Sequence, residues 1–243
     1  MRDRVALVTG AAKGLGRAVA QRCLDDGATV VLVDVDPSVA DPTLVTVGDQ
    51  GRVFAVVGDV RTRAGCEAIA KAAVRAAGRV DVLVNNAGIY PRADLFDISD
   101  ELWDADVQVN VRGVAHLSAL VAQHLIGRGA RGHIVNVASV DAFLAWPDNA
   151  HYAATKAAVV SLTRSFALRL APHGILVNGV APSAMATDEA RRAGWLDGLA
   201  AQIPLGRAVE PTEVADLIHY LGSSRTTFVT GETVLIAGGF LFR

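Results

Sequence analysis

Short apolar runs alternate along this chain with longer segments in which apolar residues recur at helical spacing. The short runs are apolar at consecutive positions, which is typical of strands that are buried on both faces of a parallel sheet. The pattern predicts strands at residues 4–9, 28–34, 51–58, 80–84, 132–139, 174–181 and 233–237.

The segments between these runs predict helices at residues 17–26, 62–77, 100–125, 148–170 and 210–221. Pro37 and Pro42 disfavour a long helix after the second strand, so we expect a loop or a single turn there. Strands that alternate with helices indicate an α/β fold with a Rossmann-type, doubly wound parallel sheet. We find no repeat, low-complexity tract or second domain, so residues 1–243 are expected to form a single domain.

A glycine cluster joins the first predicted strand to the first predicted helix. Gly10, Gly14 and Gly16 have the spacing G-x-x-x-G-x-G, which differs from the dinucleotide fingerprint G-x-G-x-x-G. Glycines let the backbone approach a pyrophosphate, and the N-terminus of the helix supplies N–H donors and a positive dipole. The cluster alone could be an ordinary tight turn, but its position between strand and helix favours a phosphate cradle.

An acid, Asp34, ends the second predicted strand. An acid about 20 residues past the glycines accepts hydrogen bonds from the adenosine ribose, and it would repel a 2′-phosphate. Asp34 therefore favours NAD over NADP, although a solvated strand-end carboxylate is the alternative interpretation. Lys13, a cation within the glycine turn, could instead bind a 2′-phosphate. We give Asp34 more weight because it would meet the ribose directly.

Tyr152 and Lys156 stand four residues apart in a predicted helix, and therefore on the same face. A free tyrosine has a pKa of about 10, and a neighbouring positive charge favours the phenolate and lowers that pKa. Ser139, at the end of a predicted strand, could hold a substrate oxygen against the phenol. The three residues predict a proton-transfer site, although a Tyr-x-x-x-Lys pair alone also occurs by chance on amphipathic helices.

Composition narrows the classes of partner. The net charge is −2, from 23 basic and 25 acidic residues in no long block, so no nucleic-acid or membrane partner is indicated. Residues 1–5 lead directly into a strand, so we expect no signal peptide. Cys23 and Cys66 are interpreted as buried thiols of a cytoplasmic protein. The six histidines lack ligand spacing, so no metal site is expected.

These motifs occur in an order that resembles the short-chain dehydrogenase/reductase family over essentially the whole chain. The glycine turn is similar to the family's cofactor motif, the Asp-Val pair after the third strand to its adenine-contacting pair, and Asn-Asn-Ala-Gly to its motif after the fourth strand. The cofactor-binding residues predicted from the sequence and this resemblance are Gly10, Lys13, Gly14, Leu15, Gly16, Asp34, Asp59, Val60, Asn86, Gly88, Tyr152, Lys156, Met185 and Thr187.

The resemblance also implies four catalytic residues, which are Asn110, Ser139, Tyr152 and Lys156. In this scheme Tyr152 exchanges a proton with the substrate, Lys156 lowers its pKa and holds the nicotinamide ribose, and Ser139 fixes the substrate oxygen. By spacing alone a mid-helix Asn110 would be neutral surface or a local kink; the resemblance implies instead that it anchors a water path for protons. It further implies a seven-stranded sheet and often a homotetramer.

The implied activity is NAD-linked oxidation of a secondary alcohol, or the reverse ketone reduction. The look-alikes within the family are 1-phenylethanol dehydrogenases, which share Gly-Ile-Tyr-Pro, His-Tyr and Ala-Pro-Ser segments with this chain. Ser183 departs from the family because glycine usually follows Pro182. A 3-oxoacyl-thioester reductase remains an alternative, and so does a catalytically silent NAD-sensing protein, since fold does not fix function.

Residues 184–203 lie between a strand and a helix and are expected to form a substrate lid. Ala190, Trp195, Leu196 and Leu199 would give it an apolar underside, and three aromatic residues should join them from other loops. The aromatic residues are Tyr90, Phe143 and Trp146. The charged lid residues, which could all point to water, are Glu189, Arg191 and Arg192. Such a pocket predicts a hydrophobic or aromatic substrate; simple lid packing or subunit contact is the alternative.

Overall fold

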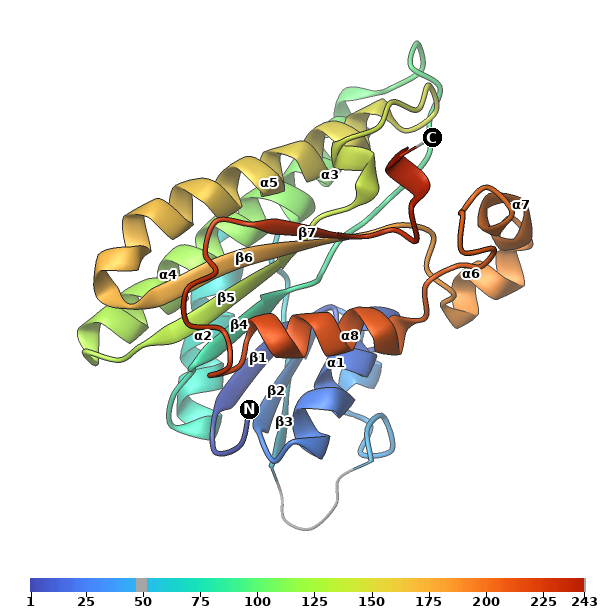
Figure 1. The fold of residues 1–243 in the computed structure, drawn as a ribbon. Helices are drawn as coiled ribbons and strands as arrows, with labels where there is room; N and C mark the ends of the chain where they lie inside the picture. Colours follow the sequence, from blue (N-terminus) through green and yellow to red (C-terminus); the bar gives the residue numbers. More distant parts are fainter. Residues whose placement is uncertain (47–51, 243) are drawn as a thin grey trace.

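The computed structural model describes residues 1–46 and 52–242, which form one twisted parallel sheet with helices on both faces (Figure 1). The strands are β1 (Val5–Thr9), β2 (Thr29–Asp34), β3 (Val53–Val57), β4 (Val82–Asn85), β5 (Gly132–Val137), β6 (Ile175–Pro182) and β7 (Thr233–Ile236). Their order in the sheet is β3-β2-β1-β4-β5-β6-β7, and all neighbours pair in parallel. The predicted α/β class, the seven-stranded sheet and the single domain are confirmed.

Helices cover both faces of this sheet. The α-helices are α1 (Gly14–Asp25), α2 (Arg63–Ala77), α3 (Asp100–Val107), α4 (Val114–Gly127), α5 (Ala150–Leu170), α6 (Asp188–Ala193), α7 (Leu196–Ala200) and α8 (Pro211–Leu221). A π-helical segment, η2 (Gln108–Gly113), joins α3 to α4, and short 3₁₀ turns are η1 (Pro37–Ala40), η3 (Val140–Ala142), η4 (Ala171–His173) and η5 (Phe240–Phe242). Helices α1 and α8 share one hydrophobic core with the sheet, while α2, α4 and α5 share the other.

Successive strand residues point into these two cores. In β1, Ala6 and Val8 pack against the α1–α8 layer, whereas Leu7 packs against the opposite layer, and all three side chains are buried. Burying one Val or Leu side chain stabilises a fold by about 1.5–3 kcal/mol. A strand covered on both sides must therefore be apolar at every position, which explains the uninterrupted runs in the sequence.

The structure interrupts one predicted helix and moves several predicted boundaries by one to three residues. The predicted helix 100–125 is interrupted by the π-helical η2, where the Asn110 amide bonds the backbone of Ile89 instead of facing solvent. Such π segments often occur at functional sites. The predicted strand 132–139 ends at Val137, so that Ser139 lies beyond the sheet. The predicted strand 51–58 appears as β3, and its first residue, Gly51, lies outside the described residues.

In the described part of the crossover between β2 and β3, residues 35–46 and 52, the chain forms the 3₁₀ turn η1 and no long helix, as the two prolines there predict. Within the described part of the chain, no helix combines the length and the apolar character needed to cross a bilayer. The same residues hold no group of three or more His, Cys, Asp or Glu side chains that could bind a metal ion. Cys23 and Cys66 are buried free thiols, as predicted.

Candidate active site

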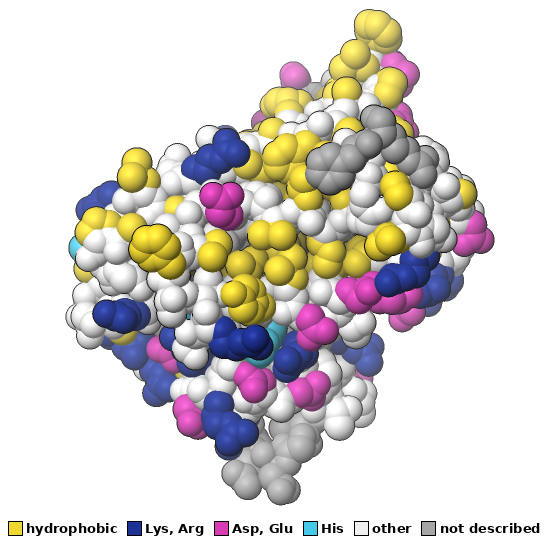
Figure 2. All heavy atoms as spheres, viewed as in Figure 1, with side chains coloured by type: hydrophobic (Ala, Val, Ile, Leu, Met, Phe, Trp, Pro, Cys, Tyr) yellow, Lys and Arg dark blue, Asp and Glu magenta, His cyan; other side chains and the backbone are white. Residues whose placement is uncertain are grey.

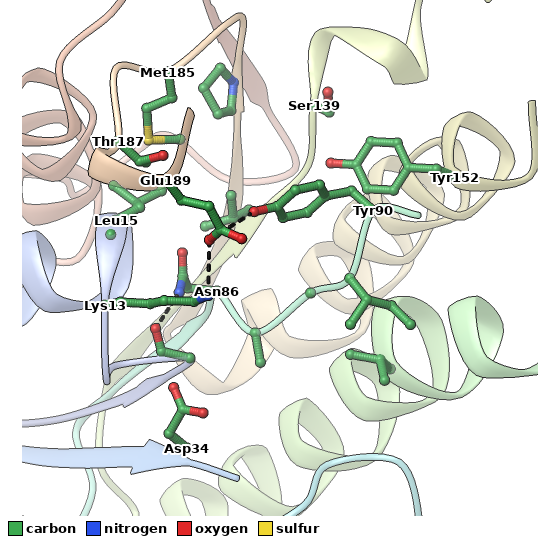
Figure 3. A pocket seen from close by; sticks show the side chains of 18 of the residues that line it. Lys13, Leu15, Asp34, Asn86, Tyr90, Ser139, Tyr152, Met185, Thr187 and Glu189 are labelled. Carbon is green, nitrogen blue, oxygen red and sulfur yellow. Dashed lines mark hydrogen bonds and ion pairs between the residues drawn. The ribbon is translucent and has the colours of Figure 1, made fainter. Parts of the chain in front are cut away.

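A pocket of about 650 Å³ opens at the carboxyl edge of the sheet (Figure 3). It lies where the strand order reverses between β1 and β4, and ligands of α/β folds bind at such switch points. The predicted cofactor residues that line it are Gly10, Lys13, Gly14, Leu15, Asp34, Asp59, Val60, Asn86, Gly88, Tyr152, Lys156, Met185 and Thr187. Gly16 lies behind this wall, and Ser139 of the predicted catalytic residues also lines the pocket.

The glycine turn fits a pyrophosphate. Gly10 and Gly14 have φ of 65° and 54°, a region that favours glycine. A Cβ on Gly16 would stand 2.0 Å from the Gly10 carbonyl oxygen, so the helix can approach the turn only because Gly16 has no side chain. The first turn of α1 contains no acidic residue, and Lys13 at its N-cap makes no side-chain capping bond. Its N–H groups and positive dipole therefore remain available to an anion.

The end of β2 presents a fixed carboxylate to the pocket. Asp34 accepts hydrogen bonds from the backbone N–H of Ala12 at 3.0 Å and of Asp36 at 3.1 Å. These bonds hold the Asp34 oxygens at the carboxyl edge of the sheet, where the loop after β2 begins. Lys13 instead forms an ion pair with Glu189 of α6 at 2.9 Å. The cation that could favour a 2′-phosphate is therefore already engaged by a carboxylate.

Ser139, Tyr152 and Lys156 meet at the inner end of the pocket. Figure 3 shows the Tyr152 ring extending from α5 toward Ser139 and toward the ring of Tyr90. The two tyrosine rings meet edge to face with centroids 6.5 Å apart. The Lys156 ammonium lies 5.5 Å from the centre of the Tyr152 ring and donates to the Val137 carbonyl at 3.0 Å. A substrate oxygen between the two hydroxyls would face a proton donor or acceptor on each side.

Burial dominates the acid–base properties of these groups. It raises the pKa of the Tyr152 phenol, the Asp141 carboxylate raises it further, and the Ser139 hydroxyl works against both. It also lowers the pKa of Lys156 to about 8, while Asp106 and Asp141 act in the opposite direction. Desolvation therefore disfavours the Tyr152 phenolate more strongly than its surroundings favour it, and the lowering of its pKa by Lys156 stays a prediction.

Asn110 lies behind the pocket and is fully buried. Its amide nitrogen donates to the Ile89 carbonyl at 2.9 Å and to the Thr155 hydroxyl at 3.1 Å, and its oxygen accepts from the Ile89 N–H at 3.0 Å. These bonds tie the loop after β4 to the helix that carries Tyr152 and Lys156. Asn110 is thus brought next to the other three predicted residues, although it does not line the pocket itself.

The lid differs in part from its prediction. Ala190 and Leu196 are buried in a small core of the lid's own, but Trp195 is 45% exposed. Phe143 and Trp146 also lie outside the described lining; the Trp146 ring stacks on Phe240 at 6.4 Å between centroids. Of the aromatic residues that we expected in the pocket wall, Tyr90 lines it.

Two charged lid residues are exposed to water, as expected, and also line the pocket. Glu189 and Arg192 belong to the lining, and Glu189 reaches across the opening to Lys13 and Tyr90 (Figure 3). Arg191 pairs with Glu210. Thr187 caps the N-terminus of α6, because its hydroxyl accepts from the Ala190 N–H at 3.1 Å. The next residues of α6 line the pocket opening.

Ser183 replaces the expected glycine after β6 and lines the pocket floor. Its hydroxyl is buried, and no described residue bonds it. A buried hydroxyl without a partner carries an unmet hydrogen-bonding need. Ser183 therefore places a buried polar atom at a position where glycine would have none.

Comparisons with known proteins agree with this geometry. Residues 10–241 match the family profile described as Enoyl-(Acyl carrier protein) reductase. The chain is similar to a 3-oxoacyl-[acyl-carrier-protein] reductase of Thermotoga maritima, with 36% identity over 99% of both chains. It is 32% identical to an NAD-dependent glycerol dehydrogenase of Listeria innocua, over 99% of this chain and 95% of that protein. The crystal structure of a 3-ketoacyl-(acyl-carrier-protein) reductase from Brucella melitensis complexed with NADH superposes with a TM-score of 0.90, 34% identity and 98% coverage of each chain.

Proposed function

The chain belongs to the short-chain dehydrogenase/reductase family of NAD(P)-dependent oxidoreductases, and we propose that it transfers a hydride between NAD(H) and a secondary alcohol or the matching ketone. The observation that carries this proposal is that Ser139, Tyr152 and Lys156 share one pocket with the glycine turn. A dinucleotide held by the turn would extend toward the three side chains that can handle a substrate proton.

The proposed roles follow from the surroundings of each group. In oxidation, Tyr152 acts as a phenolate and takes the proton of the substrate hydroxyl, while Ser139 donates to the same oxygen. Lys156 supplies a positive charge beside the phenolate, and Asn110 anchors the water path that carries protons to solvent. When bound, the nicotinamide supplies the hydride acceptor and, in its oxidised form, a further positive charge. That charge acts against the burial that raises the pKa of Tyr152.

The residues proposed to hold the cofactor come from six segments of the chain. The turn from Gly10 to Gly16 would hold the pyrophosphate, and Asp34 the hydroxyls of the adenosine ribose. The remaining proposed contacts are Asp59 and Val60 to the adenine, Asn86 and Gly88 along the cleft, Lys156 to the nicotinamide ribose, and Met185 and Thr187 to the nicotinamide amide.

Replacing Asp34 with Ser should weaken the preference for NAD over NADP. The ratio of kcat/KM for the two cofactors is expected to fall about tenfold or more, equivalent to about 1.4 kcal/mol, because the carboxylate no longer repels a 2′-phosphate. Asp36→Ser, at the exposed N-cap of η1 two residues farther along, is the matched control and should leave the ratio unchanged. An unaltered ratio in Asp34→Ser would show that another group selects the cofactor.

For the substrate, we propose a hydrophobic or aromatic secondary alcohol. The apolar side chains of Ile89, Tyr90 and Met185 line the pocket, and the Tyr90 ring already packs edge to face with Tyr152. A 3-oxoacyl thioester is the second candidate, because proteins named 3-oxoacyl-[acyl-carrier-protein] reductase resemble this chain over its whole length. Comparing kcat/KM for a phenyl-substituted secondary alcohol, a polyol of similar size and a 3-oxoacyl thioester decides between them; a clear preference for the polyol would reject both.

We also propose a homo-oligomer, with a tetramer as the expected form. Hydrophobic side chains gather over β7, between α5 and α8 (Figure 2), and β7 is an edge strand of the sheet. Leu168 of α5 is 82% exposed and Phe228 before β7 is 99% exposed. Exposed apolar surface of this kind marks association sites. Sedimentation velocity at micromolar subunit concentration should give a species larger than the monomer; a lone monomer would refute the proposal.

A further inference from the structure

A carboxylate and an imidazole face each other in the interior behind the candidate active site. Asp106 of α3 and His151 of α5 both have fully buried side chains, and Asp106 Oδ2 lies 3.5 Å from His151 Nε2. Neither Asp106 oxygen has a hydrogen-bond partner among the described residues, and the same holds for His151 Nδ1. Buried carboxylates are almost always paired, so the imidazole is the group that this carboxylate depends on.

The two side chains form the first of two contacts that join the α3–η2 segment to α5. Asp106 and Asn110 stand four residues apart on one side, and His151 and Thr155 four residues apart on the other. Residues at this spacing share a helix face. The second contact is the hydrogen bond of 3.1 Å from Asn110 Nδ2 to the Thr155 hydroxyl. In each contact, the α5 residue directly precedes a candidate active-site residue in the sequence, since Tyr152 follows His151 and Lys156 follows Thr155.

The Asp106–His151 contact lies at the start of α5, where the Asn149 side chain provides a second anchor by donating to Asp141 at 2.9 Å. Asn149, the N-cap residue, makes no side-chain capping bond. His151 Nε2 donates to the Pro91 carbonyl at 3.0 Å, so the imidazole joins the loop after β4 to the first turn of α5. The orientation of the Tyr152 ring therefore depends on contacts that His151 makes.

The negative charge of Asp106 gives this contact a second role. The Lys156 ammonium is buried, and no carboxylate of a described residue lies within 4.0 Å of it. Asp106 is the carboxylate that most strongly raises the pKa of Lys156 against the effect of burial. The titratable groups that face Asp106 are His151, Lys156 and Tyr152, all on α5. Burial raises the pKa of Asp106 above its usual value, and His151 and Lys156 act against that rise.

We propose that Asp106 is a positioning residue: as an ionised carboxylate beside His151, it helps to fix the first turn of α5 beneath Tyr152 and balances the charge of the buried Lys156 ammonium. This role rests on the proposed function only in so far as Tyr152 and Lys156 serve a hydride-transfer reaction. The pair itself, its burial and its charge are properties of the fold and can be measured without turnover.

Asp106→Asn keeps the size of the side chain and removes the charge. Because the carboxylate stabilises the Lys156 ammonium and opposes the Tyr152 phenolate, its loss lowers the pKa of both groups. Both limbs of the pH profile of kcat/KM for alcohol oxidation should therefore move to lower pH, with kcat reduced about tenfold or more through misplacement of Tyr152. His151→Asn should move the limbs in the same direction, because Asp106 then loses its partner and is protonated more readily.

Asp104→Asn is the matched control, since Asp104 lies on the same helix but is exposed, and it should change neither kcat nor the limbs. A fall in kcat at every pH with limbs that stay in place, in both Asp106→Asn and His151→Asn, would overturn the proposal and leave a purely structural contact. If Asp106→Asn does not fold, the limbs of His151→Asn decide alone.

Infrared difference spectra provide a readout that needs no substrate. Subtracting Asp106→Asn from the natural protein at neutral pH should reveal the loss of a carboxylate stretch. Loss of the carbonyl stretch of a protonated carboxyl group would overturn the proposal. Absence of turnover on any alcohol or ketone would instead refute the proposed function, while the infrared result would still decide the charge of Asp106. The same subtraction between the natural protein and His151→Asn should show protonated carboxyl appearing, and no change there would count against the Asp106–His151 pair.

Discussion

Tyr152→Phe should abolish turnover while leaving cofactor binding intact. The substitution removes only the hydroxyl that exchanges the substrate proton, and general acid–base catalysis of this kind contributes about 10²–10⁴-fold. The ring itself remains to pack against Tyr90, with which it makes an edge-to-face contact at 6.5 Å. We therefore expect kcat to fall by at least about 10²-fold, and the affinity for NADH, measured by its fluorescence, to stay unchanged.

The matched control for this variant is Tyr220→Phe, which removes a phenol from the partly exposed outer face of α8. It should leave kcat and KM at their natural values. A Tyr152→Phe protein that retained near-normal kcat would contradict the assignment of Tyr152 as the proton-exchanging group. A parallel loss of NADH affinity would mean that the phenol also supports the cofactor site, and the fall in kcat could then not be assigned to proton transfer alone.

Gly16→Ala should disrupt the cofactor cradle itself. The new Cβ would stand 2.0 Å from the Gly10 oxygen and 2.7 Å from the Asn86 amide nitrogen. Both neighbours belong to the cradle, because Asn86 donates to the Thr9 and Gly10 carbonyls at 2.9 and 3.1 Å. Relief of the clash must push α1 away from the turn, and overpacking of this kind costs about 1–3 kcal/mol. NADH affinity should fall at least tenfold, and the midpoint of thermal unfolding should drop.

Gly127→Ala in the last turn of α4 is the appropriate comparison, because a Cβ there meets no atom within 4 Å. That variant should be at least as stable as the natural chain, since alanine favours a helix over glycine by about 1 kcal/mol. If Gly16→Ala bound NADH as tightly as Gly127→Ala, the close approach of helix and turn would not be what forms the phosphate site.

Much of this architecture could be predicted from the sequence because its causes are local. The seven strands are apolar at consecutive positions, and parallel pairing brings the segments that follow β1, β4 and β5 to one edge of the sheet. Residues as distant in the chain as Gly10 and Lys156 were therefore expected in one pocket, and both line it.

What the sequence left open depends on contacts between distant segments. The π-helical turn around Asn110 arises from bonds to Ile89, which no helical spacing reveals. Trp146 was expected in the pocket, but it bonds Asp141 and stacks on Phe240 near the end of the chain. Asp106 offered one signal that sequence analysis missed: it stands four residues before Asn110, on the helix face that the Asn110 assignment places in the interior.

The measurement that tests the central claim most directly is the appearance of NADH when the natural protein is mixed with NAD and a panel of secondary alcohols. Tyr152→Phe serves as the blank, and binding of NAD is measured in parallel. The proposed hydride transfer requires steady NADH formation with at least one secondary alcohol, at a rate at least about 10²-fold above that of the blank. Tight binding of NAD without NADH formation from any alcohol would contradict this mechanism and favour a protein that senses the nucleotide. Turnover seen only as NADP formation from ketones and NADPH would also contradict it.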